Sequence, residues 1–226
     1  MHYYCTKLIP TMAQPIGTLT GSWQTISEKH KGIGAIEGKN RYQARRGAST
    51  EPYGVFWLEI KQVLSNGNLI VRNLTERGKR RIQQLSDTIE SDLVFPAVSG
   101  ADIKRWCAEP KIYILMSQDP QKSEPYPEHQ MKSKWPRTYG YLTRFNDILL
   151  SRGSKTVQQF AEKTTFYAMF GIGPYTAARY KVVWKRMASD LVAAVISQYK
   201  TPFGYKTVIP TDTTLLFATD IESEAH

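Results

Sequence analysis

The sequence predicts an α+β fold, built from mixed or antiparallel β-sheets with a few packed helices. Short apolar segments rich in β-branched and aromatic residues recur between residues 54 and 218, which is typical of strands. Asn66-Gly67 lies between two such segments and is a strong signal for a hairpin turn. Strands precede and follow the helical segments and do not alternate with them one by one. This order favours α+β over α/β.

The chain divides into two regions of different character. Residues 1–31 are punctuated by Pro and Gly and have only short apolar pieces, so we expect an irregular N-terminal arm there. Residues 32–226 carry the predicted strands and helices, and we expect one domain. The predicted strands are Gly54–Ile60, Asn68–Leu74, Leu93–Val98, Lys111–Met116, Tyr180–Trp184, Leu191–Ile196, Thr207–Ile209 and Leu215–Ala218.

Helical patterns are fewer than strand patterns. An apolar stripe with i, i+1, i+4, i+7, i+8 spacing predicts one helix that ends at Arg152-Gly153. Its members are Tyr141, Leu142, Phe145, Ile148 and Leu149. A second helix is expected over residues 155–163. The turn Ser99-Gly100-Ala101-Asp102 is expected to cap a short helix that runs through Cys107. Residues 117–136, rich in Pro, Lys, Ser and Gln, predict a long surface loop.

The charge of the chain points to a polyanionic partner. Thirty Lys and Arg residues against twenty Asp and Glu residues give a formal net charge of +10. Such a surface attracts nucleic acid above all, although a basic protein without a nucleic-acid partner has the same composition. The run Arg72, Arg77, Lys79, Arg80 and Arg81 could contact phosphates or form a solvated face.

Other classes are disfavoured by what the sequence contains. Cys5 and Cys107 lie far apart, and the four histidines are scattered, so neither a structural zinc site nor a disulfide framework is expected. No apolar run approaches the roughly 18 residues of a membrane span, and the N-terminus does not have the pattern of a signal peptide. We therefore expect no membrane partner and a cytoplasmic location.

Two enzymatic alternatives rest on short motifs. Glu59-Ile60-Lys61 is the E-x-K triplet that metal-dependent nucleases place on a strand, with Glu51 and Glu37 as upstream carboxylates. Neither upstream carboxylate follows an apolar strand as that core requires, so a strand whose polar face carries Glu59 and Lys61 is the simpler interpretation. The segment from Phe170 to Ala177 is similar to the hairpin of helix-hairpin-helix DNA glycosylases, but the residues after it favour a strand where that family needs a helix.

A set of segments in fixed order carries a more extensive resemblance. The first segments are Arg46-Gly47-Ala48-Ser49-Thr50, Gly54-Val55-Phe56-Trp57, Leu93, Pro96, Gly100-Ala101-Asp102-Ile103, Arg105-Trp106 and Ile112–Leu115. The later ones are Pro136, Thr138, Tyr139, Tyr141, Leu142, Leu149, Arg152, Tyr180–Trp184, Pro210 and Glu224-Ala225-His226. Together they resemble the C-terminal target-recognition region of N6-adenine DNA methyltransferases of restriction-modification systems, over roughly residues 41–226.

This resemblance implies a division of labour between two domains. A catalytic domain would bind S-adenosylmethionine and methylate a flipped adenine, and the recognition domain would choose the site on double-stranded DNA. This sequence has neither the family's Gly-rich cofactor turn nor its Pro-Pro tetrapeptide; Gly32-Ile33-Gly34 and Gly171-Ile172-Gly173 are lone pairs. We therefore expect no cofactor in this chain, no methyl transfer by it alone, and an N-terminal methyltransferase domain or a separate catalytic subunit as its partner.

The resemblance also implies which residues meet DNA. They are the Arg, Lys and hydroxyl residues of the two loops, together with two residues at the start of the predicted long helix. The candidates are Arg45, Arg46, Ser49, Thr50, Lys104, Arg105, Arg137 and Tyr139. Arginine would pair with guanine in the major groove. Tyr139 and Trp106 could instead support the loops by packing.

Overall fold

A computed structural model describes residues 11–15, 18–26, 42–78 and 80–226. The chain divides into two compact units, residues 1–42 and 43–226. In the first unit, strand β1 (Met12–Pro15) pairs antiparallel with strand β2 (Trp23–Ile26). These eight residues therefore form strands, whereas the sequence predicted an irregular backbone for residues 1–31.

The second unit contains a six-stranded and a four-stranded sheet, which confirms the α+β class. The larger sheet has the strand order β17-β7-β10-β4-β5-β6 and is antiparallel except where β17 runs parallel to β7. Its strands are β4 (Trp57–Val63), β5 (Leu69–Asn73), β6 (Ser86–Ile89), β7 (Val94–Val98), β10 (Ile112–Leu115) and β17 (Ile209–Pro210). The predicted hairpin at Asn66-Gly67 joins β4 to β5, and Gly67 has a φ of 82°.

The smaller sheet is fully antiparallel, with the order β14-β13-β18-β3. Its strands are β3 (Arg45–Arg46), β13 (Tyr180–Lys185), β14 (Ala193–Ile196) and β18 (Thr214–Thr219). Three hairpins complete the β-structure: β8 (Ile103–Lys104) with β9 (Cys107–Ala108), β11 (Gln118–Asp119) with β12 (Glu124–Pro125), and β15 (Gln198–Thr201) with β16 (Gly204–Thr207).

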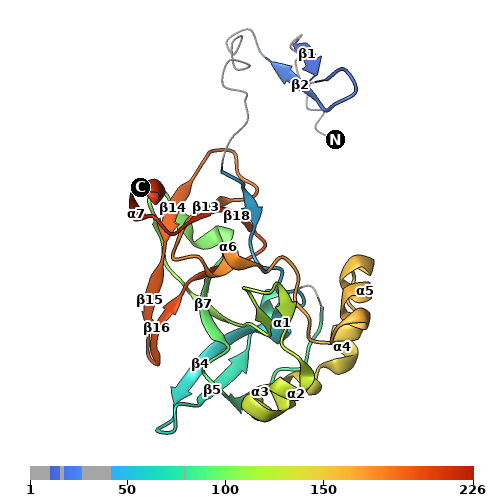
Figure 1. Cartoon of the computed structure of the whole chain (residues 1–226), viewed down its shortest axis with the longest axis vertical. Helices are drawn as coiled ribbons and strands as arrows, with labels where there is room; N and C mark the ends of the chain where they lie inside the picture. The colour runs from blue at the N-terminus through green and yellow to red at the C-terminus, as the bar shows by residue number, and fades with distance from the viewer. Residues whose placement is uncertain (1–10, 16–17, 27–41, 79) are drawn as a thin grey trace, which may run out of the picture. The chain divides into compact units, whose positions relative to one another are not determined.

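The helices are short, and none that the structure describes is long and apolar enough to cross a membrane. They are α1 (Tyr53–Phe56), α2 (Glu128–Lys134), α3 (Pro136–Thr143), α4 (Asn146–Leu150), α5 (Lys155–Lys163), α6 (Pro174–Ala177) and α7 (Glu222–Ala225), with 3₁₀ turns η3 (Thr75–Arg77) and η4 (Gly100–Asp102). Helices α2 to α5 gather on one side of the second unit, whereas the β15–β16 hairpin projects on another (Figure 1).

Four sequence predictions need correction. Residues 54–56 are helical and the strand begins at Trp57, because strand-like apolar residues are equally suited to a buried turn of helix. The expected helix over 141–149 is two helices, α3 and α4. The turn at Ser99 caps a single 3₁₀ turn, and a hairpin follows where a helix was expected. The expected loop over 117–136 contains β11, β12 and α2. The helix expected over residues 155–163 is confirmed by α5.

Two hydrophobic cores hold the second unit together. The larger core lies on the six-stranded sheet, where Phe56, Leu58 and Ile114 pack with Tyr141 and other residues of the helices. The smaller core lies on the four-stranded sheet around Val183 and Leu216, and it also takes Val98 and Ile103. Because Ile103 is 1% exposed, the base of the β8–β9 hairpin is fixed to this sheet.

Candidate nucleic-acid interface

The two Arg-bearing loops lie at the same end of the four-stranded sheet, beside its opposite edge strands β3 and β14. Arg46 lies opposite Leu215, which lies opposite Trp184, which in turn lies opposite Ala193. The carbonyl of Ala193 accepts a hydrogen bond of 2.9 Å from the backbone N–H of Trp106. One row of paired residues thus leads from the first loop to the β8–β9 hairpin. Three strand spacings place Arg46 about 14 Å from Ala193. We call this region the basic sheet end; its residues are Arg46, Lys104, Arg105, Trp106, Lys185, Arg186 and Asp212.

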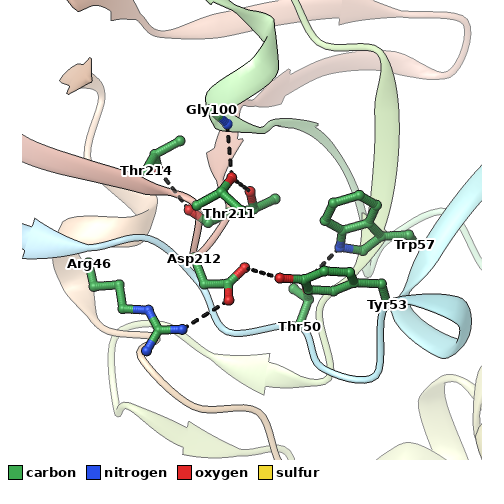
Figure 2. A network of polar contacts seen from close by, with 9 residues as sticks. Arg46, Thr50, Tyr53, Trp57, Gly100, Thr211, Asp212 and Thr214 are labelled. Atoms are coloured by element: carbon green, nitrogen blue, oxygen red, sulfur yellow. Dashed lines mark hydrogen bonds and ion pairs between the residues drawn. The ribbon is translucent and has the colours of Figure 1, made fainter. Parts of the chain in front are cut away.

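Arg46 is braced by a carboxylate that sequence reasoning did not identify. Its guanidinium donates to the Asp212 carboxylate at 2.9 Å, and the hydroxyl of Tyr53 donates to the other Asp212 oxygen at 2.8 Å (Figure 2). Asp212 is 8% exposed, whereas the Arg46 side chain is 46% exposed. Arg46 is therefore held through its Nη2 atom, and the rest of its half-exposed guanidinium still presents N–H donors to solvent.

Tyr53 is fixed as a hydrogen-bond donor in this network. Burial, the hydrogen bond to Asp212 and the negative charge of Asp212 raise the pKa of Tyr53 well above its usual range. The ring of Tyr53 also stacks on Trp57, with ring centroids 4.3 Å apart. A protonated, stacked tyrosine leaves the Asp212 carboxylate in one orientation, and that carboxylate in turn orients Arg46.

The segment that carries Asp212 ties the two loops together. The N–H of Ala48 donates to the Pro210 carbonyl at 2.8 Å, which anchors the first loop. The N–H of Gly100 donates to the Thr213 hydroxyl at 2.8 Å, which anchors the second loop. Thr211 is buried, and its N–H donates to the Val98 carbonyl at 2.9 Å. Both loops consequently share one rigid support, as binding loops require.

A cleft of about 510 Å³ opens beside Asp212, between Tyr53 and the second loop. Its lining residues are Tyr53, Gly100, Ala101, Lys185, Arg186, Met187, Asp212 and Thr213. Arg186 and Met187 are exposed and belong to the connection between β13 and β14, which sequence reasoning did not connect with the site. They add cationic and apolar surface next to the two predicted loops.

The second loop is held by a capping box and carries exposed cations. The N–H and the hydroxyl of Ser99 donate to the Asp102 carboxylate at 2.8 Å and 2.6 Å, which confirms the predicted cap. Lys104 and Arg105 follow on the β8–β9 hairpin, and both are exposed. They are therefore free to reach a phosphate or a base edge from a fixed backbone.

The remaining candidate residues of the first loop differ in how accessible they are. Arg45 is exposed, donates to the Gln43 side chain at 2.6 Å and lies over the Tyr175 ring. Ser49 is half-buried, and its N–H donates to the Phe170 carbonyl. Thr50 is fully buried and accepts the indole N–H of Trp57 at 2.6 Å. Thr50 therefore supports the loop, and its burial does not fit the expected DNA contact.

Arg137 and Tyr139 lie elsewhere in the second unit. They belong to α3, which packs beside β6, whereas Asp212 follows β17. β6 and β17 are the two opposite edges of the six-stranded sheet. The backbone N–H of Arg137 donates to Glu90, and the hydroxyl of Tyr139 donates to Glu128 at 2.7 Å. The structure does not bring these two residues to the basic sheet end.

The nuclease-like triplet Glu59-Ile60-Lys61 and the glycosylase-like segment from Phe170 to Ala177 lie in structural contexts that differ from those in the two enzyme families. The Glu59 carboxylate forms ion pairs with Lys61 at 2.8 Å and with Arg72 at 2.7 Å, so both of its oxygens are already bound by basic side chains. No three His, Cys, Asp or Glu side chains in the described part of the chain form a metal-binding group; Glu37 and Gly32–Gly34 lie outside that part. After Gly171, the four residues of α6 lead into strand β13, as the sequence favours.

The basic run after β5 is partly engaged within the fold. Arg72 pairs with Glu59 and Glu76, and Arg80 donates to the Ile148 carbonyl and the Ser151 hydroxyl. Arg77 and Arg80 border a hollow of about 670 Å³ that also contains Glu51 and Glu76. This surface has mixed charge and no exposed aromatic side chain among its lining residues.

Comparison of the chain with models of protein families and with curated proteins found no match.

Proposed function

We propose that this protein is the DNA sequence-recognition domain of a site-specific N6-adenine DNA methyltransferase from a restriction-modification or phage-defence system. The supporting observation is the basic sheet end, where two Arg-bearing loops distant in sequence share one support. An N-terminal methyltransferase domain or a separate catalytic subunit supplies S-adenosylmethionine and the methyl transfer. The proposal carries with it a cytoplasmic location.

The chemistry of the basic sheet end suits contact with a DNA major groove and its flanking phosphates. Four strand spacings place Arg46 about 19 Å from Trp106 on the β8–β9 hairpin, more than the groove width of about 12 Å, so one loop can enter the groove while the other meets the backbone beside it. A braced Arg46 can offer two parallel N–H donors to the O6 and N7 atoms of guanine. Lys104 and Arg105 on the hairpin lie within reach of the flanking phosphates or a second base. Arg45 and Ser49 remain secondary candidates, while Thr50 acts through Trp57.

The isolated chain is expected to bind duplex DNA weakly and with strong salt dependence. A domain with about five phosphate contacts releases enough counterions to give a log–log salt slope of about −4 to −5. Titration of a labelled 24-base-pair duplex between 50 and 300 mM salt measures this slope. Affinity that stays constant over this range would show that docking on phosphates is the wrong description.

Arg46 and Arg105 are expected to contribute more to sequence choice than Arg81, an exposed arginine of the basic run. Loss of a base-reading arginine costs about 1–3 kcal/mol at the preferred site and little elsewhere. Loss of a phosphate contact weakens all sequences about equally. Selection from a randomised duplex library gives the preferred site of the wild type, and titrations then compare preferred and scrambled duplexes for each variant.

The matched variants are Arg46→Ala, Arg105→Ala and Arg81→Ala. The first two should narrow the affinity ratio between preferred and scrambled DNA, and the third should leave the ratio unchanged. Equal losses on both duplexes for all three variants would remove the two loops as readers of sequence. Selection that enriches no motif with the wild type would contradict the proposed function itself.

A further inference from the structure

Trp106 is the most exposed tryptophan that the structure describes, and it lies at the tip of the β8–β9 hairpin. Its side chain is 81% exposed, whereas Trp57 in the core is 5% exposed. The expectation that Trp106 supports the loops by packing is therefore wrong. A large aromatic side chain in water contributes nothing to folding, yet it offers a wide flat surface to a ligand.

The backbone of Trp106 is held in an unfavourable conformation. Its φ of 68° lies in the left-handed region, which disfavours residues with a bulky side chain. Its N–H is fixed by the hydrogen bond to Ala193, and Ile103 at the base of the hairpin is buried in the smaller core. The fold thus fixes the backbone from which the exposed indole projects, although burial of the indole repays none of the strain.

The surroundings of Trp106 identify the chemistry of the ligand. Arg105 precedes it, Lys104 opens the turn, and both side chains are exposed. The row of paired residues that ends at Ala193 begins at the braced Arg46. An aromatic ring among cations, at the same sheet end as a candidate guanine reader, suits a nucleobase next to phosphates, because every base offers a flat face for stacking.

We propose that Trp106 inserts into the DNA duplex and stacks on a base, acting as a wedge that fills the gap when a nucleotide leaves the helix. This inference rests on the proposed function and adds a role in deforming the duplex. Side chains inserted between base steps unstack them, and the cost is lowest where a base is already absent. A duplex with an abasic site should therefore take up the indole more readily than an intact one.

The test uses the full chain with two 24-base-pair duplexes, one intact and one with a central tetrahydrofuran abasic site. The wild type should bind the abasic duplex about 10-fold more tightly, and its fluorescence should be quenched on binding. Trp106→Ala should lose the abasic preference. Trp106→Phe should keep most of the preference for the abasic duplex. The difference in fluorescence quenching between the wild type and Trp106→Phe then gives the part of the quenching that comes from the Trp106 indole.

Three controls separate stacking from other roles. Trp106→Gly relieves the positive φ, so it should fold at least as stably as the wild type and still lose the abasic preference. Trp23→Ala removes another exposed tryptophan, and Leu191→Ala removes an exposed apolar side chain near Ala193; both should bind like the wild type. If Leu191→Ala and Trp106→Ala weakened binding equally on both duplexes, a general apolar contact would replace the wedge.

The outcomes distinguish this inference from the function on which it rests. A wild type that binds both duplexes equally, with Trp106→Ala unchanged, would overturn the wedge and leave DNA recognition intact. A wild type that binds neither duplex at low salt would overturn both. Loss of the abasic preference in Trp106→Ala and Trp106→Gly, with normal thermal unfolding of both variants, would establish the wedge.

Discussion

Gly47→Ala is expected to destabilise the second unit by about 4 kcal/mol, because a new methyl group has no space there. A Cβ atom at Gly47 would lie 2.1 Å from the Thr211 carbonyl oxygen and 2.6 Å from that of Pro210, both backbone atoms. The N–H groups of Gly47 and Ala48 donate to Thr214 and Pro210, so any shift also breaks the pairing that positions Arg46. Denaturant unfolding followed by circular dichroism measures the loss.

Gly140→Ala is the matched control for this substitution. Gly140 lies inside α3, and a Cβ atom there meets nothing within 4 Å. Alanine is the better helix former, so this variant should gain about 0.5–1 kcal/mol. If Gly47→Ala unfolded at the same denaturant concentration as Gly140→Ala, the close approach of residues 47 and 210–211 would be wrong, and with it the shared support of the two loops.

The sequence predicts the strands well where a single local pattern decides the structure. β5, β7, β10, β13 and β18 appear within one or two residues of their predicted ranges, because each combines β-branched residues with nearby turn signals. The helix over 141–149 shows where such patterns fail. Its apolar stripe is buried except for the half-buried Ile148, but the N–H groups of Arg144 and Phe145 bond to carbonyls three positions back, and the helix is interrupted there.

Of the cations at the basic sheet end, Arg46, Lys104 and Arg105 were candidates from the sequence, whereas Lys185, Arg186 and the support around Asp212 were not. Arg46 and Arg105 lie in loops whose composition indicates nucleic-acid contact from sequence alone. Asp212 is 166 residues from Arg46 in the chain, and nothing in the local sequence around either residue connects them. The pairing of β3 with β18 brings Arg46 and Asp212 together. Because β3 has only two residues, it is too short to show a periodic pattern in the sequence. The exposure of Trp106 depends in the same way on tertiary packing of the hairpin.

Lys181 leads to the second large expected effect, a stability that rises with pH. Its side chain is fully buried in β13, between Ile196 of β14 and Ala218 of β18, and its ammonium donates to the Ala178 carbonyl at 2.7 Å. Burial lowers the pKa of Lys181 to about 7, only partly opposed by the negative charge of Asp220. The unfolded chain, with an ordinary lysine, binds this proton up to a pH of about 10.4.

Between pH 7 and pH 9.5 the unfolded state therefore holds more protons than the folded state, and the free energy of unfolding should rise. One proton contributes at most about 1.4 kcal/mol per pH unit, so the rise from Lys181 is about 3 kcal/mol.

Lys181→Met keeps the length of the side chain without the charge and should lose this rise, while being more stable than the wild type at pH 7. Lys206, whose pKa burial also lowers, is present in both proteins, so the difference between their pH profiles isolates Lys181. Parallel profiles for wild type and Lys181→Met from pH 7 to pH 9.5 would show that Lys181 remains charged in the folded protein at all these pH values, with a counter-charge close enough to offset its burial.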